Sequence, residues 1–181
     1  MIYTKRIEEA IYFATAAHEG QKRKVKGEPY IVHPLSVALI LARLGSDEDV
    51  IIAGLLHDLV EDTKVTLEEI RKRFGNNVAE LVDHLTEQEK PTWEERKNLA
   101  KEHIKEMPQG ALLVKSAEVL YNMRNILIHR KEMGDKVYSF FGAPKEKNLA
   151  HFDSRIKELS KAWPENPLLP ELQEVMDRLM E

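Results

Sequence analysis

The chain contains no cysteine among its 181 residues. It therefore forms no disulfide bond and no zinc site of the cysteine-rich finger type. It also lacks any apolar run of the roughly 18–20 residues that a membrane-spanning helix needs. Its first residues lead into an amphipathic pattern and not into a signal peptide. We therefore expect a soluble, cytoplasmic protein with no membrane partner.

Basic residues are not in excess: Lys and Arg number 27 against 31 Asp and Glu, which gives a net charge of −4. This charge argues against a protein whose whole surface binds nucleic acid, while a local basic patch remains compatible with it. The hydrophobic content of 43% and the charged content of 32% are ordinary for a globular protein. The length predicts one domain, residues 1–181, with a single sizeable core.

Apolar residues recur at helical spacing along the chain, and no alternating strand pattern, internal repeat or low-complexity segment is present. Polar caps and glycine stops set the expected boundaries. The predicted helices cover residues 4–19, 33–44, 46–58, 66–74, 78–85, 92–107, 111–132, 144–160 and 170–180. We therefore predict an all-α fold, a bundle of about eight to ten helices.

One apolar helix is followed at once by a cluster of polar side chains. Residues 50–56 are apolar nearly all round, and His57, Asp58, Glu61 and Asp62 come next. Burying a histidine and a carboxylate is costly unless a partner such as a metal ion binds them. On a helix these four residues share overlapping faces. The pattern predicts metal ligands followed by an acid/base pair; the alternative is an ordinary helix end with a solvated turn.

Two further residues are candidates to complete a metal site. His33 opens a helix among apolar neighbours, and Glu118 lies in a helical pattern flanked by Ala117, Val119 and Leu120. Simpler explanations exist for both residues. A lone histidine often caps a helix, and Glu118 is spaced to form an ion pair with Lys115 on a solvated face of the same helix. The predicted ligand set is therefore His33, His57, Asp58 and Glu118. Two imidazoles and two carboxylates suit Mn, Fe or Zn.

A basic loop precedes His33. Four cations fall within five positions of the glycine-bounded segment 20–27, namely Lys22, Arg23, Lys24 and Lys26. The loop is either a solvated charged turn or an anion site, in which arginine offers a flat fork to phosphate or stacks on a base.

Four segments together carry a resemblance to a known family. They are GQKR…GEPYIVHP (20–34), LLHDLVEDT (55–63), TLEEI (66–70) and K…NMR (115–124). They resemble the hydrolase domain of RelA/SpoT-type proteins, an HD-domain family, over about residues 7–127. This implies an HD-domain helical bundle with the helices of residues 144–180 packed on it. It also implies Mn²⁺-dependent removal of the 3′-pyrophosphate of (p)ppGpp, the alarmone of the stringent response.

The resemblance implies a role for each matched residue. His33, His57, Asp58 and Glu118 would bind the metal, Glu61 and Asp62 would orient and deprotonate the attacking water, and Arg23, Lys24, Lys26 and Asn122 would contact the nucleotide. The chain departs from the family twice, with Glu118 in place of Asp and Tyr121 in place of His. Because 181 residues accommodate only the hydrolase domain, we expect a stand-alone small alarmone hydrolase of the metazoan SpoT-homologue type.

The chemistry leads to the same hypothesis. A divalent cation makes water more acidic and offsets phosphoryl charge, and a nearby carboxylate accepts the proton. Two alternatives stay open: a phosphohydrolase that acts on another nucleotide or on NADPH, and a degenerate HD domain that senses a nucleotide. The sequence leaves open whether the protein forms an oligomer.

Overall fold

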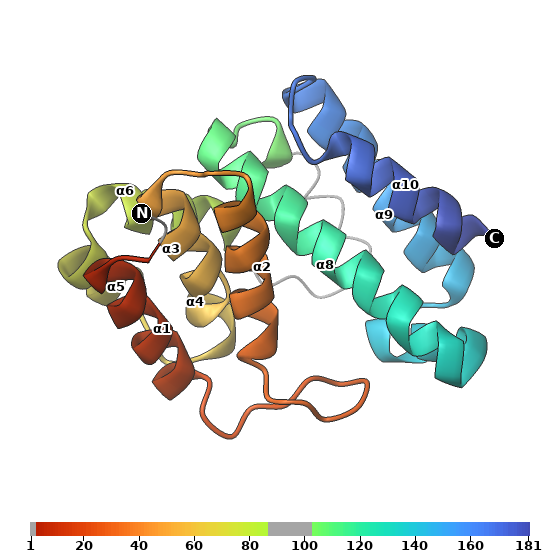
Figure 1. Cartoon of the computed structure of the whole chain (residues 1–181), viewed down its shortest axis with the longest axis horizontal. Helices are drawn as coiled ribbons and strands as arrows, with labels where there is room; N and C mark the ends of the chain where they lie inside the picture. Colours follow the sequence, from red (N-terminus) through yellow and green to blue (C-terminus); the bar gives the residue numbers. More distant parts are fainter. Residues whose placement is uncertain (1–2, 87–102) are drawn as a thin grey trace.

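The computed structural model describes residues 3–86 and 103–181, and this part of the chain is all-α (Figure 1). Within those two ranges no β-strand occurs, and the only strand-like pairing is an isolated antiparallel bridge between Lys22 and Pro29. The predicted fold class is therefore confirmed. Most of the helix expected at 92–107 lies outside the described residues.

The helices follow the predicted order closely. Thr4 caps the first by accepting a hydrogen bond from the Ile7 amide, and Thr66 forms the capping box expected with Glu69. The elements are α1 (Lys5–Ala17), α2 (Val32–Arg43), α3 (Glu48–Leu56), α4 (Leu59–Asp62), α5 (Leu67–Phe74), α6 (Asn76–Leu85), α8 (Gln109–Met133), the 3-10 helix η1 (Gly134–Phe141), α9 (Lys145–Ala162) and α10 (Leu169–Met180). The 3-10 helix was not predicted.

Helix α3 is the buried centre of one half of the molecule. Its residues 51–56 are all buried, and it packs against α1, α2, α6 and α8. The long helix α8 runs through the middle, with α2 and α3 on one side and α9 and α10 on the other (Figure 1). A site beside the middle of α8 can therefore receive side chains from both halves.

Gly54 allows α3 to approach α2 closely. A Cβ atom at this position would lie 2.5 Å from Cδ1 of Leu41 and 3.4 Å from Cγ1 of Val37. This close approach brings the carboxyl end of α3, which carries His57, toward the first turn of α2, which carries His33.

The predicted continuous helix through the His57–Asp58 pair is interrupted. Helix α3 ends at Leu56 and α4 begins at Leu59, with a turn between them. At this break the Nδ1 of His57 lies 2.9 Å from the carbonyl oxygen of Gly54, the acceptor that the Asp58 amide would use in an unbroken α-helix. The polar residues nevertheless stay within one turn of each other.

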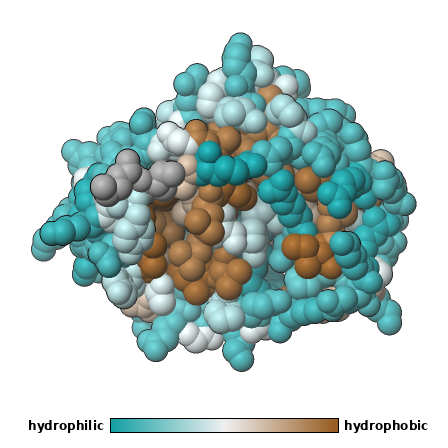
Figure 2. All heavy atoms as spheres, in the orientation of Figure 1, coloured by the Kyte–Doolittle hydropathy of each residue, from teal (hydrophilic) through white to brown (hydrophobic). Residues whose placement is uncertain are grey.

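The surface is mostly hydrophilic on the face drawn in Figure 2, with apolar atoms gathered near its middle. None of the described helices combines the length and the apolar character needed to cross a lipid bilayer.

Candidate active site

Two buried histidines face each other where α2 and α3 meet. His33 is 2% exposed and His57 is 3% exposed, and their Nε2 atoms lie 3.1 Å apart. The Nδ1 of His57 is positioned to donate its hydrogen to the carbonyl of Gly54, so in the neutral ring Nε2 carries a lone pair. This lone pair points at the Nε2 atom of His33. Two nitrogen atoms this close are stable only when a proton or a cation lies between them. The pair is therefore suited to share a metal ion.

Asp58 completes a group of three ligands. Its Oδ1 lies 3.1 Å from Nε2 of His57, and its Oδ2 lies 3.4 Å from Nε2 of His33. One ligand atom from each residue lies within 4.8 Å of the others, and no other such group occurs in residues 3–86 and 103–181. Two imidazoles and a carboxylate at this spacing fit a divalent cation.

The ionisation of these groups favours cation binding. Burial lowers the pKa of His33 to about 3, so the ring is neutral and its nitrogen can act as a ligand. Burial alone would raise the pKa of Asp58, but the neighbouring His57 and His33 rings outweigh it and hold that pKa below its usual range. The site therefore offers the neutral nitrogen of His33 and the carboxylate of Asp58 near neutral pH.

Tyr30 joins the metal cluster to Asp62. Its hydroxyl oxygen lies 2.8 Å from Oδ2 of Asp58 and 2.7 Å from Oδ2 of Asp62. The two carboxylates that the sequence placed four residues apart thus share one phenol. Tyr30 was not among the predicted site residues, although it stands three residues before His33 in the resembling motif. Glu61, predicted to act with Asp62, is exposed on α4.

Glu118 lies outside the group of three. Its Oε2 is 2.8 Å from Nζ of Lys115 and its Oε1 is 3.8 Å from a guanidinium nitrogen of Arg155, while the Asn122 amide donates to Oε1 at 3.4 Å. Burial would raise the pKa of Glu118, but Lys115 and Arg155 outweigh it and hold that pKa far below its usual range. The carboxylate is therefore ionised and sits between two cations.

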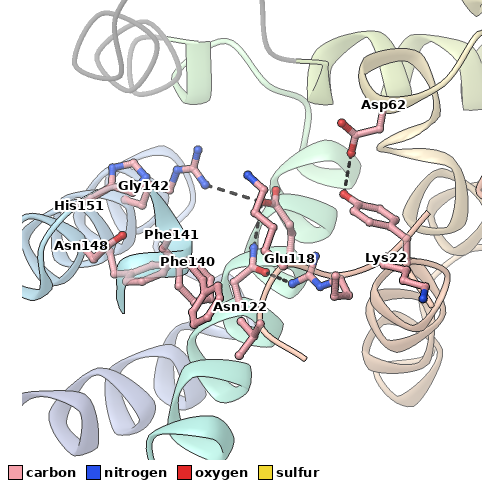
Figure 3. A pocket seen from close by; sticks show the side chains of 15 residues that line it. Lys22, Asp62, Glu118, Asn122, Phe140, Phe141, Gly142, Asn148 and His151 are labelled. Atoms are coloured by element: carbon pink, nitrogen blue, oxygen red, sulfur yellow. Dashed lines mark hydrogen bonds and ion pairs between the residues drawn. The ribbon is translucent and has the colours of Figure 1, made fainter. Parts of the chain in front are cut away.

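A cavity of about 380 Å³ adjoins these residues. Figure 3 shows side chains from four parts of the chain around it: the basic loop, the end of α4 at Asp62, the middle of α8, and η1 with α9. Arg23, Lys24 and Asn122, which the sequence assigned to the nucleotide, are in its lining, together with Lys22, Tyr30, Asp62 and Glu118. Lys26 is not in this lining; its ammonium pairs with Glu132.

Arg23 has the most defined position in the basic loop. Its guanidinium lies 5.5 Å from the ring centroids of both Tyr30 and Tyr121, and it donates to Oδ1 of Asn122 at 3.3 Å. A planar cation held between aromatic rings and an amide is a preorganised surface for a base or a phosphate.

The η1–α9 side of the cavity was missed by sequence reasoning. It supplies Phe140, Phe141, Asn148, His151, Phe152 and Arg155. Residues 134–181 lay outside the resembling segments. The only available signal was the apolar pattern that predicted a helix at 144–160, and that pattern does not show which polar residues of the helix face a site.

Comparison with known proteins identifies the family. The model of the HD domain matches residues 10–142. A guanosine-3′,5′-bis(diphosphate) 3′-pyrophosphohydrolase of Xenopus tropicalis is 46% identical over 121 residues, which cover 65% of this chain and 68% of that protein. One with the same description from Aquifex aeolicus is 43% identical over 139 residues, 75% of this chain but 20% of that protein. The chain thus spans about a fifth of the length of this bacterial relative.

A solved structure agrees along almost the whole chain. It belongs to a metazoan ortholog of SpoT described as hydrolysing ppGpp, with a TM-score of 0.82 and 27% identity, and the match covers 97% of this chain and 96% of that one. The chain belongs to the HD-domain family, in its RelA/SpoT-type branch.

Proposed function

We propose that the protein is a metal-dependent guanosine-3′,5′-bis(diphosphate) 3′-pyrophosphohydrolase that releases pyrophosphate from (p)ppGpp. The observation that carries this proposal is the His33–His57–Asp58 cluster, joined through Tyr30 to an Asp62 that lines a cation-rich cavity. The description of the Xenopus tropicalis relative, two thirds of which this chain covers, supports the choice of substrate.

The metal would be held by His33, His57 and Asp58, with Glu118 as the proposed fourth ligand. We propose Mn²⁺, with Fe or Zn as the other ions that this donor set accepts. Such an ion, when bound, makes water more acidic and offsets negative charge on phosphoryl oxygens. The ionised state of Glu118 supports a role beside a cation.

Asp62 would accept the proton of the attacking water. It is exposed to the cavity and is tied to the metal cluster by the Tyr30 hydroxyl, which fixes the position of its carboxylate. Proton acceptance requires hydrogen-bond range to the water, and a carboxylate held beside the metal cluster and open to the cavity would be available for it. Glu61 would help to orient the same water from α4.

The nucleotide would occupy the cavity between the basic loop and α8. Arg23 would offer its guanidinium face to the guanine and its charge to the phosphates, Lys24 would add charge, and Asn122 would contact the ribose. All three line the cavity, and Arg23 donates to the Asn122 amide oxygen. Lys26 would act at longer range, because its ammonium pairs with Glu132. Four cationic side chains line the cavity against two carboxylates, which favours a polyanionic ligand.

The test is pyrophosphate release from ppGpp by the metal-stripped protein before and after Mn²⁺ is added. We expect release only with the metal, with GDP as the other product, and a release that is lowered by orders of magnitude in an Asp62→Ala variant. A folded protein that releases no pyrophosphate with Mn²⁺, Fe²⁺ or Zn²⁺ overturns the proposal. The same assay with a panel of other nucleotides and NADPH tests the alternative function. A phosphohydrolase that acts on one of them would release phosphate and not pyrophosphate. The cytoplasmic location and the role in the stringent response stay predictions.

A further inference from the structure

Asp62 stands at the end of a very short helix. It is the last residue of α4, a single turn of four residues, and its backbone amide donates to the carbonyl of Asp58 at 2.9 Å. The carbonyl of a residue at the end of a helix has no donor within that helix. A carboxylate at such an end keeps one position only if contacts from elsewhere in the chain fix it.

Gln21 supplies one of these contacts. Its side-chain Nε2 donates to the backbone carbonyl of Asp62 at 2.6 Å, although the two residues are 41 positions apart. The carbonyl of Gln21 accepts the backbone amide of Tyr30 at 3.0 Å, and the Tyr30 hydroxyl lies 2.7 Å from the Asp62 carboxylate. Gln21, Tyr30 and Asp62 are thus joined to one another in a closed set of three contacts. This set fixes both the backbone and the side chain of Asp62.

His18 fixes the orientation of the Gln21 amide. It is only 3% exposed, and its Nδ1 lies 2.7 Å from Oε1 of Gln21. Because the Gln21 nitrogen donates to a carbonyl, the amide oxygen must be the acceptor, and Nδ1 of His18 therefore carries the hydrogen. The same imidazole packs on the ring of Tyr30, with 4.7 Å between the ring centroids. His18 thus contacts both residues that hold Asp62.

Anchoring the basic loop is the other role that Gln21 could have. Gln21 stands two residues before Arg23, so a bond that only anchored the loop would matter for nucleotide binding. The loop has a contact of its own with α8, because Arg23 donates to Oδ1 of Asn122. The side-chain bond of Gln21 goes instead to the residue that carries the proposed base.

We infer that Gln21 is a positioning residue that holds Asp62 in place to accept the proton, and that His18 orients it for this purpose. That role rests on the proposed function of the site. Gln21 is in neither the cavity lining nor the metal cluster, so it acts on the reaction through Asp62. Its loss should therefore lower the rate of the chemical step and leave the affinity for metal and nucleotide unchanged.

The test replaces the Gln21 amide by an apolar side chain of similar length. Gln21→Met should lower kcat for pyrophosphate release from ppGpp roughly tenfold to a hundredfold, the effect of misplacing a reacting group by up to about 1 Å. KM and the calorimetric affinity for Mn²⁺ should not change. His18→Phe keeps a ring beside Tyr30 but removes the donor to Gln21, so it should cause a smaller loss of the same kind. Gln173→Met, at an exposed glutamine of α10, is the matched control and should match the wild type.

The Asp62→Ala background distinguishes positioning from a general structural role. If Gln21 acts through the Asp62 carboxylate, Gln21→Met should not lower the residual rate of Asp62→Ala any further. A further loss in that background, an unchanged kcat, a change in KM alone, or the same loss in Gln173→Met overturns the inference. Urea denaturation shows which variants are folded, and His18→Phe provides the test should Gln21→Met not fold.

Failure of the proposed function has a different signature, because the wild type would then release no pyrophosphate from ppGpp with any of the three metals. The crystal structure of Gln21→Met gives a readout that needs no activity. We expect the Asp62 carboxylate to have moved away from the Tyr30 hydroxyl, which would support the positioning role. A carboxylate that keeps this contact overturns that role, whether or not the protein is active.

Discussion

Lys115 and Glu118 form a buried ion pair one turn apart on α8, with 2.8 Å between Nζ and Oε2 and side chains only 6% and 14% exposed. An exposed pair at this spacing contributes little to stability. A buried pair behaves differently, because removing one partner leaves an uncompensated charge in the interior. The sequence allowed a pair on a solvated face; the structure has the pair, but buried beside the metal cluster.

Glu118→Gln should therefore destabilise the fold as well as the site. The neutral amide removes the charge that Lys115 pairs with at 2.8 Å and that Arg155 lies beside. We expect a loss of about 3 kcal/mol in the free energy of unfolding, measured by urea denaturation. Glu118→Asp keeps the charge, so its loss should be smaller. Because the resemblance implies Asp at this position, Glu118→Asp should also raise the rate of pyrophosphate release. A lower rate would mean that this site needs the longer side chain.

Substitutions of Asp58 and Asp62 should have different effects on metal binding and on turnover. Asp58→Ala removes a ligand of the three-residue group, so both Mn²⁺ binding and pyrophosphate release should be lost. Asp62→Ala should retain the metal and lower turnover by roughly 10²–10⁴-fold, the usual contribution of a general base. Calorimetric titration with Mn²⁺ and a turnover assay give the two readouts. Equal loss of metal in both variants would reject this division of roles.

Tyr30→Phe should lower turnover while leaving the fold intact. One phenol O–H cannot be donated to Asp58 and Asp62 at the same time, so the hydroxyl couples the positions of both carboxylates. Its loss should lower kcat and Mn²⁺ affinity by roughly tenfold to a hundredfold, as for other residues that orient ligands. Tyr12→Phe, at an exposed tyrosine, is the control. A variant with unchanged kcat would show that Asp62 is held by other contacts.

His33 should make the metal-free protein less stable in acid. Burial lowers its pKa from 6.5 to about 3. Above pH 6.5 the ring is neutral in both states, and between these two values the unfolded chain binds a proton that the folded protein does not. Stability should therefore fall as the pH drops from about 6.5 toward 3, by up to about 1.4 kcal/mol per pH unit. The measurement is urea denaturation between pH 7 and pH 4.

The comparison variant for this pH effect is His33→Gln. It lacks the titrating ring but keeps the acidic residues nearby, so its stability should change less over the same range. If wild type and variant lose stability in parallel, the carboxyl groups account for the pH dependence and the neutral state of His33 contributes nothing to it.

The sequence predicts the parts of the site that lie close together along the chain. The capping box at Thr66, the boundaries of α8 and the apolar run that buries His57 are all set by local pattern, and they occur in the structure as expected. The contact between His33 and His57 depends on how two helices pack, which local pattern does not show. It could be predicted only from the resemblance. These features follow from periodicity, caps and motif order.

The rest depends on contacts between residues far apart in sequence. Arg155 lies 3.8 Å from Glu118, although the two residues are 37 positions apart in the sequence. No periodic pattern distinguishes Arg155 from the other cationic residues of α9. The Tyr30 bridge depends on the fold of a loop, which pattern analysis describes only as irregular. The break between α3 and α4, where the His57 ring contacts the Gly54 carbonyl, interrupts a pattern that reads as one continuous helix. Such features require the tertiary arrangement.

Gly54 links the packing of the core to the metal cluster, and Gly54→Ala should affect both. Alanine favours a helix by about 1 kcal/mol over glycine, but its Cβ would lie 2.5 Å from Cδ1 of the fully buried Leu41. Overpacking of this kind costs about 1–3 kcal/mol, so we expect a net loss of stability in urea denaturation. Because the Gly54 carbonyl orients His57, Mn²⁺ affinity should fall as well.

Gly110→Ala is the matched control for Gly54→Ala. Its Cβ would lie 3.0 Å from Cδ2 of Leu81 and 3.2 Å from Cγ2 of Val50, so it too meets packed side chains, but none of the proposed metal ligands. It should lower stability and leave Mn²⁺ affinity unchanged. If both variants weaken metal binding equally, the effect comes from a general loss of stability. If only Gly54→Ala does, the close approach of α3 to α2 is what holds His57 in position to share a cation with His33.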